Sequence, residues 1–255
     1  MPQARGQILG GAIVTGAGQG LGRAYALALA EQGASVVAAD LNSESAERVA
    51  EEIRALGGHA TGTQVDVADR ASVDGMVSAA REAYGAPVVL VNNAAIFSTL
   101  RMRPFAEIPD DEWDRVMAVN VRGAFNCSRA AVPFMAQAGY GKIINISSAT
   151  IWNGRPFYLH YVTSKAALIG FTRALASEVG PLGIRVNAIT PGSTQTEIER
   201  VTVTAEQRRA MAEQTPLRRG EVADDLVGTV LFLASRESDF ITGQTINVDG
   251  GFTFH

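Results

Sequence analysis

The chain has 255 residues, of which 47% are hydrophobic and 19% charged, and this composition supplies enough apolar residues for one large α/β domain. The net charge of −4 argues against a surface built to bind nucleic acid. No run of about 18 apolar residues is present to span a membrane, the N-terminus lacks the apolar core of a secretory signal, and the single cysteine, Cys127, cannot form an intrachain disulfide. We therefore expect a cytoplasmic protein with no membrane partner, in which Cys127 packs in the core.

Short apolar, β-branched runs alternate along the chain with longer helical patterns. Strands are predicted over 11–16, 34–40, 59–67, 87–93, 141–148, 183–190 and 245–250, and helices over 21–32, 43–58, 70–84, 111–138, 158–179, 205–213 and 223–235. In helix 43–58, Ser43 is the predicted N-cap, and Gly57 and Gly58 the stop. Strands with nearly continuous apolar runs are typical of parallel sheets covered on both faces. The pattern predicts one doubly wound α/β domain over 1–255, with a seven-stranded parallel sheet and helices on both faces.

The stretch TGAGQGLG, residues 15–22, follows the first predicted strand and opens the first helix. Its glycines allow positive φ and let backbone N–H groups approach a pyrophosphate, while the helix N-terminus favours negative charge. The same glycines would also suit a plain tight turn. The order strand, turn, helix favours dinucleotide binding.

Asp40 ends the second predicted strand, 20 residues after Gly20. That spacing suits a carboxylate that accepts hydrogen bonds from an adenosine ribose. The carboxylate would repel a 2′-phosphate, and the neighbouring Leu41 and Asn42 offer no cation to hold one, so NAD is predicted rather than NADP. Arg23 is the nearby cation that would weaken this preference, and Asp40 could also serve as a plain strand-end turn former.

Three further polar positions have two interpretations each. Asp66 ends the third predicted strand and either contacts an adenine or caps the next helix. In NNAA, 92–95, the two asparagines either satisfy the loop or touch a ribose, and the small residues let a cofactor lie against the backbone. Asn120 lies within helical pattern 111–138, either as a functional buried side chain or as a structural bridge.

Tyr161 and Lys165, four residues apart, share one face of the predicted helix 158–179. An ammonium at about 4 Å, with an effective dielectric constant of about 20, favours a phenolate by roughly 4 kcal/mol before desolvation. This lowers the tyrosine pKa from near 10 by at most about three units, which would let the phenol transfer protons near neutral pH. Ser148, at the end of a strand 13 residues earlier, can reach a substrate oxygen beside Tyr161. The alternative is an ordinary surface pair on an amphipathic helix.

Together these residues, with YVTSK (161–165), PGSTQT (191–196) and VDGG (248–251), resemble the short-chain dehydrogenase/reductase family, NAD-preferring branch, over essentially the whole chain. The resemblance implies a Rossmann fold and a homotetramer packed through helices 111–138 and 158–179. It implies that Tyr161 is the general acid/base, that Lys165 lowers its pKa and holds the nicotinamide ribose, that Ser148 polarises the substrate oxygen, and that Asn120 holds a water that relays protons. The implied NAD-binding residues are Gly16, Gln19, Gly20, Leu21, Gly22, Asp40, Leu41, Asp66, Val67, Asn93, Ala94, Ala95, Tyr161, Lys165, Pro191, Gly192, Thr194 and Thr196, and no metal site is expected.

The predicted activity is hydride transfer between NAD(H) and a secondary alcohol or ketone, with an aryl or cyclic substrate suggested by similarity to bacterial secondary-alcohol members. The candidate pocket residues are Phe97, Leu100, Ile151, Trp152, Phe157 and His160, under a lid over approximately 193–215. One alternative is an NADPH-dependent 3-oxoacyl-acyl-carrier-protein reductase, which would share the same catalytic set. Another is a non-catalytic dinucleotide-binding sensor.

Overall fold

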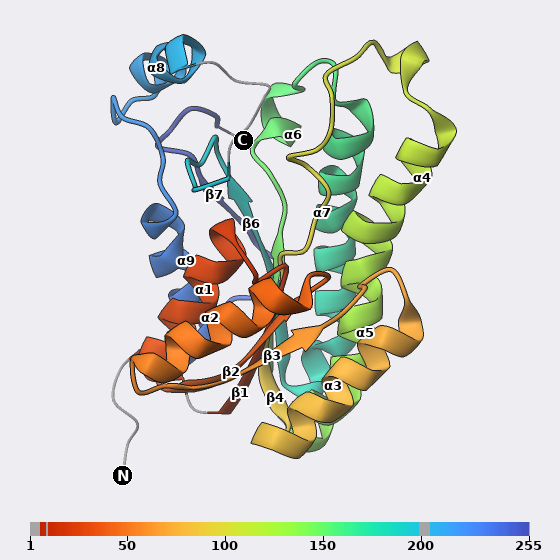
Figure 1. The fold of residues 1–255 in the computed structure, drawn as a ribbon, viewed down its shortest axis with the longest axis vertical. Coiled ribbons are helices and arrows are strands. Elements are labelled where there is room, and N and C mark those ends of the chain that lie inside the picture. The colour runs from red at the N-terminus through yellow and green to blue at the C-terminus, as the bar shows by residue number, and fades with distance from the viewer. Residues whose placement is uncertain (1–5, 9, 199–204, 255) are drawn as a thin grey trace.

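The structure, a computed structural model, describes residues 6–8, 10–198 and 205–254. Seven parallel strands form one sheet in the order β3-β2-β1-β4-β5-β6-β7, and the strands are drawn as arrows in Figure 1. The strands are β1 (Gly10–Thr15), β2 (Ala34–Asp40), β3 (His59–Gln64), β4 (Pro87–Asn92), β5 (Gly141–Ile146), β6 (Ile184–Pro191) and β7 (Thr245–Val248). The predicted single-domain, doubly wound fold is confirmed.

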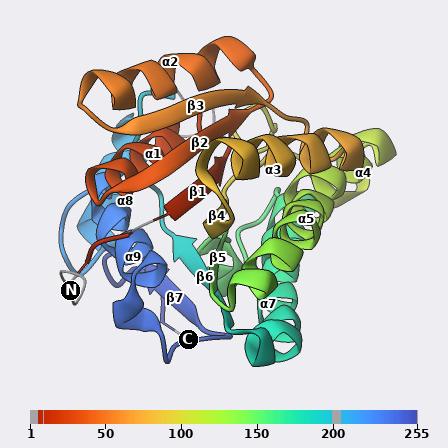
Figure 2. The same cartoon turned by 90° about the horizontal axis from the view of Figure 1, so that it is seen from below.

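Helices cover both faces of this sheet (Figure 2). The helices are α1 (Gly20–Glu31), α2 (Ser43–Ala55), α3 (Arg70–Tyr84), α4 (Asp110–Met117), α5 (Gly123–Ala138), α6 (Thr150–Asn153), α7 (Leu159–Val179), α8 (Ala205–Gln214) and α9 (Asp224–Ala234). One apolar core joins α1, α2 and α9 to the sheet, and a second joins α3, α5 and α7 to the opposite face. Within the described residues, no helix has the length and apolar character needed to cross a bilayer.

The two cores explain why the strands read as continuous apolar runs. On β2, Val36 and Ala38 point into the first core, whereas Val37 and Ala39 point into the second. Because successive side chains alternate between faces, a strand covered on both sides needs apolar residues at every position. Cys127 is fully buried in the second core, and burial raises the pKa of its thiol to about 12, which confirms its predicted packing role.

Several local predictions need correction. Asn42, and not Ser43, caps α2, because its Oδ1 accepts a hydrogen bond from Ser45 N at 3.0 Å. The third strand ends at Gln64 rather than at residue 67. The loop before Tyr161 contains the short helix α6. The helical pattern 111–138 is interrupted by a π-helical turn over Ala118–Arg122, which joins α4 to α5.

Candidate active site

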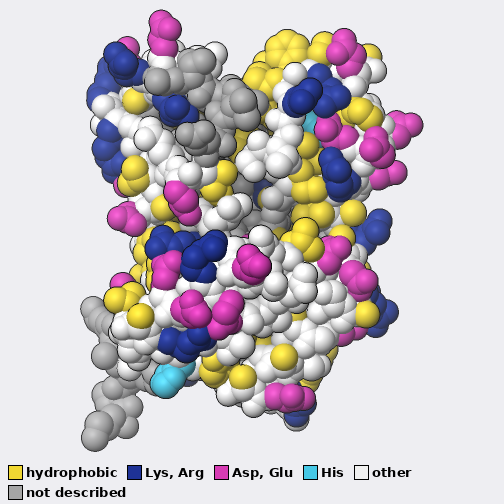
Figure 3. All heavy atoms as spheres, in the orientation of Figure 1, with side chains coloured by type: hydrophobic (Ala, Val, Ile, Leu, Met, Phe, Trp, Pro, Cys, Tyr) yellow, Lys and Arg dark blue, Asp and Glu magenta, His cyan; other side chains and the backbone are white. Residues whose placement is uncertain are grey.

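Two adjoining hollows lie where the strands end, between the parts of the molecule that carry α8 and α4 (Figures 1 and 3). One, of about 520 Å³, is lined by the predicted cofactor residues Gly16, Gln19, Leu21, Gly22, Asp40, Leu41, Asp66, Val67, Asn93, Ala94, Ala95 and Thr196. The other, of about 170 Å³, is lined by Ser148, Tyr161, Lys165, Pro191, Gly192 and Thr194. They share Leu21, Asn93, Ala95 and Phe97. The fold therefore brings most of the predicted dinucleotide and catalytic residues into one continuous depression, whereas Gly20 and Asn120 line neither hollow.

The turn after β1 is packed too tightly for side chains. Gly16 has φ of 64°, and a Cβ there would lie 2.9 Å from the Cα of Ala94. A Cβ on Gly22 would collide with the carbonyl oxygen of Gly16. Asn93 holds this turn, because its Nδ2 donates to the carbonyls of Thr15 at 3.0 Å and Gly16 at 3.1 Å. The glycines are thus needed for the close approach of backbone to backbone, and Asn93 has the structural role left open by its sequence.

The first turn of α1 is suited to bind an anion. Gln19 is its N-cap but provides no side-chain cap. Instead, the backbone N–H of Gly20 donates to Glu197 Oε1 at 2.8 Å, across 177 residues of sequence. A carboxylate here occupies the position that a phosphate oxygen takes at a helix N-terminus. The turn therefore fits a cofactor pyrophosphate, for which Glu197 would have to move aside.

Asp40 faces the same hollow from the end of β2. Its carboxylate accepts hydrogen bonds from Gly18 N at 2.9 Å and Asn42 N at 3.0 Å, so its position is set by the glycine turn itself. The nearby cation considered in the sequence analysis, Arg23, is engaged elsewhere, because its Nε donates to Glu52 Oε2 at 2.9 Å. Among the described residues, no cation forms an ion pair with the Asp40 carboxylate.

Asp66 is exposed at the far end of the hollow and is not a helix cap. Its Oδ1 accepts from Ala68 N at 2.9 Å, which closes a local turn. The cap of α3 is Asp69, whose Oδ1 accepts from Ala71 N and Ser72 N. Of the two interpretations offered by the sequence, the helix cap is wrong.

Ser148, Tyr161 and Lys165 come from β5 and α7 and are all buried. Ser148 follows the end of β5, and its Oγ accepts hydrogen bonds from Thr150 Oγ1 at 2.9 Å and Thr150 N at 3.3 Å. Its own hydroxyl proton is then available to a further acceptor. The Oγ of the preceding Ser147 donates to the carbonyl of Lys165 at 2.7 Å, which fixes α7 to the end of β5.

The Lys165 ammonium lies beside Tyr161, as the four-residue spacing predicts. Its Nζ is 5.8 Å from the centre of the Tyr161 ring and donates to the carbonyl oxygen of Ile146 at 2.8 Å. No described carboxylate forms an ion pair with it, and burial lowers the pKa of Lys165 to about 7. The amine is therefore close to its titration point, so a neighbouring anion or hydrogen-bond acceptor determines its charge.

Asn120 occupies the π-helical turn between α4 and α5, where an extra residue per turn directs its side chain inward. Its Oδ1 accepts from Ile96 N at 2.8 Å, and its Nδ2 donates to Ser164 Oγ at 3.0 Å. Asn120 thus links the loop after β4 to α7, the helix that carries Tyr161 and Lys165. These bonds show the structural bridge, and the proton-relay water remains a prediction.

The predicted pocket residues divide into two groups. Phe97 lines both hollows, and its ring centre is 4.5 Å from that of Tyr161. His160 instead is fully buried with its Nε2 3.2 Å from Glu112 Oε1, and Trp152 Nε1 donates to Thr190 Oγ1. Leu100 packs in the small core around Val116, and neither Phe157 nor Ile151 lines the catalytic hollow.

Several lining residues of the catalytic hollow were not singled out from the sequence, among them Asn153, Arg155, Met211 and Phe252. Asn153 and Arg155 flank Gly154, which has φ of 59° and ends α6. The sequence NGR resembles many surface turns, so only the closure of α6 over the strand ends places these side chains at the site. Met211 and Phe252 arrive from α8 and from the segment after β7.

Comparison with known proteins supports a common family. The family model described as enoyl-(acyl carrier protein) reductase matches residues 16–253. An uncharacterised oxidoreductase of Mycobacterium tuberculosis is 45% identical over 94% of this chain and 96% of its own. The 3-oxoacyl-[acyl-carrier-protein] reductase of Staphylococcus aureus is 41% identical with the same coverage. The dehydrogenase subunit for (2S)-[(R)-hydroxy(phenyl)methyl]succinyl-CoA of Thauera aromatica is 37% identical over 94% of this chain and 95% of its own.

Solved structures agree with these relatives. A gluconate 5-dehydrogenase from Burkholderia cenocepacia, in complex with NADP and tartrate, superposes with a TM-score of 0.91, 36% identity and 97% coverage of both chains. A short-chain type dehydrogenase/reductase from Mycobacterium marinum gives a TM-score of 0.90, 35% identity and 98% coverage of both chains. With the whole sheet, the glycine turn and the Ser148, Tyr161 and Lys165 cluster in place, the chain belongs to the short-chain dehydrogenase/reductase family and is an oxidoreductase.

Proposed function

We propose that the protein transfers a hydride between NAD(H) and a secondary alcohol or its ketone. The observation that carries this proposal is the convergence of Ser148, Tyr161 and Lys165 on a hollow that adjoins the glycine turn. A proton-transferring group next to a dinucleotide-sized depression is the arrangement that alcohol oxidation requires.

Each residue of the cluster has a distinct role in this reaction. Bound NAD supplies the hydride acceptor, and NADH the donor. Tyr161 takes the hydroxyl proton of the alcohol during oxidation and returns it to the carbonyl oxygen during reduction. The Lys165 ammonium stabilises the phenolate form of Tyr161 and donates to the nicotinamide ribose, while Ser148 donates its hydroxyl proton to the substrate oxygen.

NAD is proposed over NADP on the electrostatics of the β2 end. The Asp40 carboxylate would meet a 2′-phosphate directly, and Arg23 is already paired with Glu52. The solved gluconate 5-dehydrogenase relative contains NADP, the cofactor that this proposal disfavours for the present chain. A direct comparison of the two cofactors is therefore part of the test below.

The proposed substrate is a secondary alcohol, including aryl examples. Phe97 stacks against Tyr161, and Phe252 lines the same hollow, so aromatic surface borders the reacting oxygen. The named substrate of the Thauera relative has its hydroxyl on a carbon that bears a phenyl group. This likeness supports, for the present chain, a pocket that accepts a ring beside the carbinol carbon.

A second candidate, reduction of 3-oxoacyl chains on acyl carrier protein, is favoured by the 41% identity to the S. aureus reductase. It uses the same proton transfer but needs NADPH and a long pantetheine arm. The Asp40 carboxylate opposes this reading, because it disfavours the phosphate that distinguishes NADPH.

The decisive experiment measures reduction of a panel of aryl and alkyl ketones, and of a 3-oxoacyl thioester, with NADH and with NADPH. We expect aryl ketones to be reduced with at least a tenfold preference for NADH. Tyr161→Phe should lower turnover by roughly 10²–10⁴-fold, the usual worth of a positioned acid or base, while NADH binding measured by fluorescence stays within about twofold. Tyr84→Phe, which removes an exposed hydroxyl that contacts Thr61, is the matched control.

Three outcomes would contradict the proposed function, each in a different way. Unchanged turnover in Tyr161→Phe would remove Tyr161 from the mechanism. Faster thioester reduction with NADPH would favour the second candidate. NADH binding without turnover of any ketone or alcohol would favour the non-catalytic sensor.

Two architectural expectations belong to the same proposal. We propose that segment 193–215, of which 199–204 lie outside the described residues, acts as a lid, because Met211 of α8 and Ser193 line the catalytic hollow. We also propose a cytoplasmic homotetramer built through α5 and α7. These helices share an apolar hollow of about 410 Å³ that includes Phe125, Val132 and Phe171. Light scattering on the purified protein tests the tetramer.

A further inference from the structure

The charged side chains that line the catalytic hollow are all cationic among the described residues. The described lining contains two cationic side chains, Lys165 and Arg155, and no aspartate or glutamate. Lys165 is buried behind Tyr161 and donates to the Ile146 carbonyl, so its charge serves the reacting oxygen. Arg155 is half-buried and lines the same hollow.

Among the described residues, none accepts a hydrogen bond from the guanidinium of Arg155, which packs against an aromatic ring instead. Its guanidinium carbon lies 5.5 Å from the centre of the Tyr158 ring, and Tyr158 is itself 1% exposed. A guanidinium that rests on an aromatic face keeps its donors directed outward from its edge. No described carboxylate forms an ion pair with it, whereas Arg23, Arg54, Arg103 and Arg219 all have one.

The position of Arg155 is tied to the catalytic serine. Its backbone N–H donates to the Thr150 carbonyl at 3.3 Å, and Thr150 Oγ1 donates to Ser148 Oγ at 2.9 Å. The Tyr158 ring that supports Arg155 meets the Tyr161 ring edge-on, with centres 6.4 Å apart. Arg155 is thus linked to Ser148 through Thr150 and to Tyr161 through the Tyr158 ring.

Resting on the proposed function, we propose that the substrate carries a carboxylate and that Arg155 binds it, so that the enzyme acts on a hydroxy acid and its oxo acid. A planar, delocalised cation with an unused edge is the group that binds a carboxylate through two parallel hydrogen bonds. The uncharged amide donor of Asn153 lines the same hollow and can complete the contact. The cofactor pyrophosphate is a different anion with its own site at the first turn of α1.

The test compares oxo acids with their methyl esters, which differ in charge but little in shape. The pairs are benzoylformate, acetoacetate and levulinate, each with its ester, reduced with NADH by the full-length wild type, Arg155→Gln and Arg155→Lys. We expect the wild type to favour at least one acid over its ester by about tenfold to a hundredfold in kcat/KM, the range for a hydrogen-bonded charge. Arg155→Gln should abolish this preference mainly through KM and leave the rate with the ester within about threefold.

Two controls separate a substrate role from a structural one. Arg70→Gln removes an exposed arginine on α3, whose side chain is 69% exposed, and should change nothing. Arg155→Lys keeps the charge but loses the planar fork, so it should restore only part of the preference. The NADH dissociation constant should be unchanged in Arg155→Gln, which separates the substrate carboxylate from the cofactor phosphates.

A binding measurement keeps this inference separate from the proposed function. Calorimetry on the enzyme–NADH complex compares benzoate with benzamide, neither of which can be reduced. If the wild type binds benzoate more tightly than benzamide, and Arg155→Gln removes this difference, the carboxylate site at Arg155 is supported even if none of the ketones is turned over. A preference for acids over esters that survives Arg155→Gln would overturn the inference. So would a wild type that prefers neither the acids in turnover nor benzoate in binding.

Discussion

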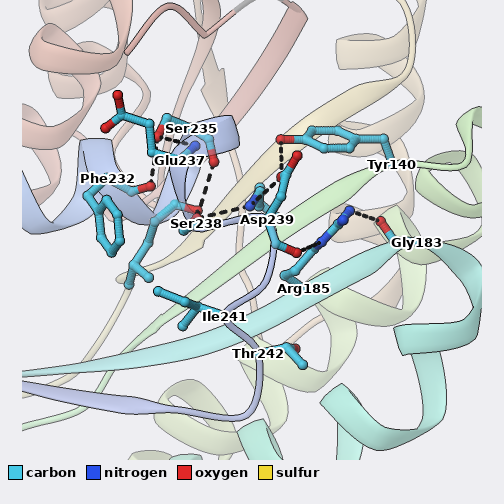
Figure 4. Close-up of polar contacts among 12 residues, drawn as sticks. Tyr140, Gly183, Arg185, Phe232, Ser235, Glu237, Ser238, Asp239, Ile241 and Thr242 are labelled. Carbon is cyan, nitrogen blue, oxygen red and sulfur yellow. Dashed lines mark hydrogen bonds and ion pairs between the residues drawn. The ribbon is translucent and has the colours of Figure 1, made fainter. Parts of the chain in front are cut away.

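Two buried lysines lie near opposite ends of β5, and only one of them has a carboxylate partner among the described residues. Lys142, at the start of the strand, is 1% exposed and donates to Ser238 Oγ, with its Nζ 2.9 Å from Asp239 Oδ1. Figure 4 shows this cluster, in which Tyr140 also donates to the Asp239 carboxylate and Arg185 to its backbone carbonyl. Lys165, packed against the end of the strand, has the Ile146 carbonyl and no described carboxylate.

Burial lowers the pKa of both lysines, but a partner opposes this effect only at Lys142, where the hydrogen bond and charge of Asp239 favour the ammonium. The Lys142 charge is therefore neutralised inside the fold and available to nothing else. The Lys165 charge is not neutralised, so it can act on a phenolate that forms during a reaction. A buried cation without an anion costs stability, and a site that keeps one is typical of function rather than of folding.

The first way to break this comparison is to remove the Lys165 amine. Lys165→Met should reduce turnover by about a thousandfold, since the phenolate of Tyr161 loses its stabilising charge. The free energy of unfolding should stay the same or increase, because an unpaired buried charge is removed. Steady-state kinetics and urea denaturation measure the two effects. Loss of stability without loss of turnover would reverse the roles assigned to the two lysines.

The matched change at the other end of β5 should do the opposite. Lys142→Met strands the Asp239 carboxylate, which is one-third exposed, and should lower the free energy of unfolding by about 1–3 kcal/mol. Turnover should stay within about twofold of wild type. The double variant Lys142→Met/Asp239→Asn should recover at least half of the lost stability, because no charge is left unpaired. A double variant less stable than Lys142→Met would contradict the ion-pair explanation.

The smallest expected effect is a dependence of stability on pH, which tests the contrast between paired and unpaired buried charges. Burial raises the pKa of Glu221, which lies against Gly192, from 4.5 to about 7, and lowers that of Lys165 from 10.5 to about 7. The native state then binds more protons than the unfolded state at Glu221 below pH 7, so stability falls as pH rises from about 4.5 to 7. At Lys165 the unfolded state binds more protons above pH 7, so stability rises again, by at most about 1.4 kcal/mol per pH unit for each group.

Urea denaturation at pH 5, 7 and 8.5 measures this dip. Glu221→Gln should flatten the acidic side, and Lys165→Met should flatten most of the alkaline side, with a smaller contribution in the same direction from Lys142. A curve that keeps both slopes in the two variants would show that other groups determine the dip.

Much of this architecture follows from local patterns. The alternation of apolar runs and helical stretches determined the sheet and the two helix layers, because burial on both faces requires apolar residues at every strand position. The glycine turn, the carboxylate at Asp40 and the spacing of Tyr161 and Lys165 depend on neighbours within one turn or one strand–helix unit. Such short-range relations can be predicted from the order of residues along the chain.

The errors occurred where distant segments compete for the same group. Ser43 and Asn42 both suit an N-cap, and only the path of the chain from β2 selects Asn42. His160 and Trp152 looked like pocket residues, but packing against Glu112 and Thr190 turned them into structural ones. Arg155 went unnoticed because a loop arginine carries no signal until α6 folds over the strand ends.

By itself, then, the sequence determined the fold, the glycine turn and the spacing of Tyr161 and Lys165, since each rests on periodicity or on contacts between near neighbours. Only the tertiary structure decided which charges are neutralised and which are left to act on a ligand, as with Lys142 and Lys165, or Arg23 and Arg155. The reason is physical: the energy of a charge depends on its burial and on partners that come from remote parts of the chain, and these are set by the packing of the whole domain.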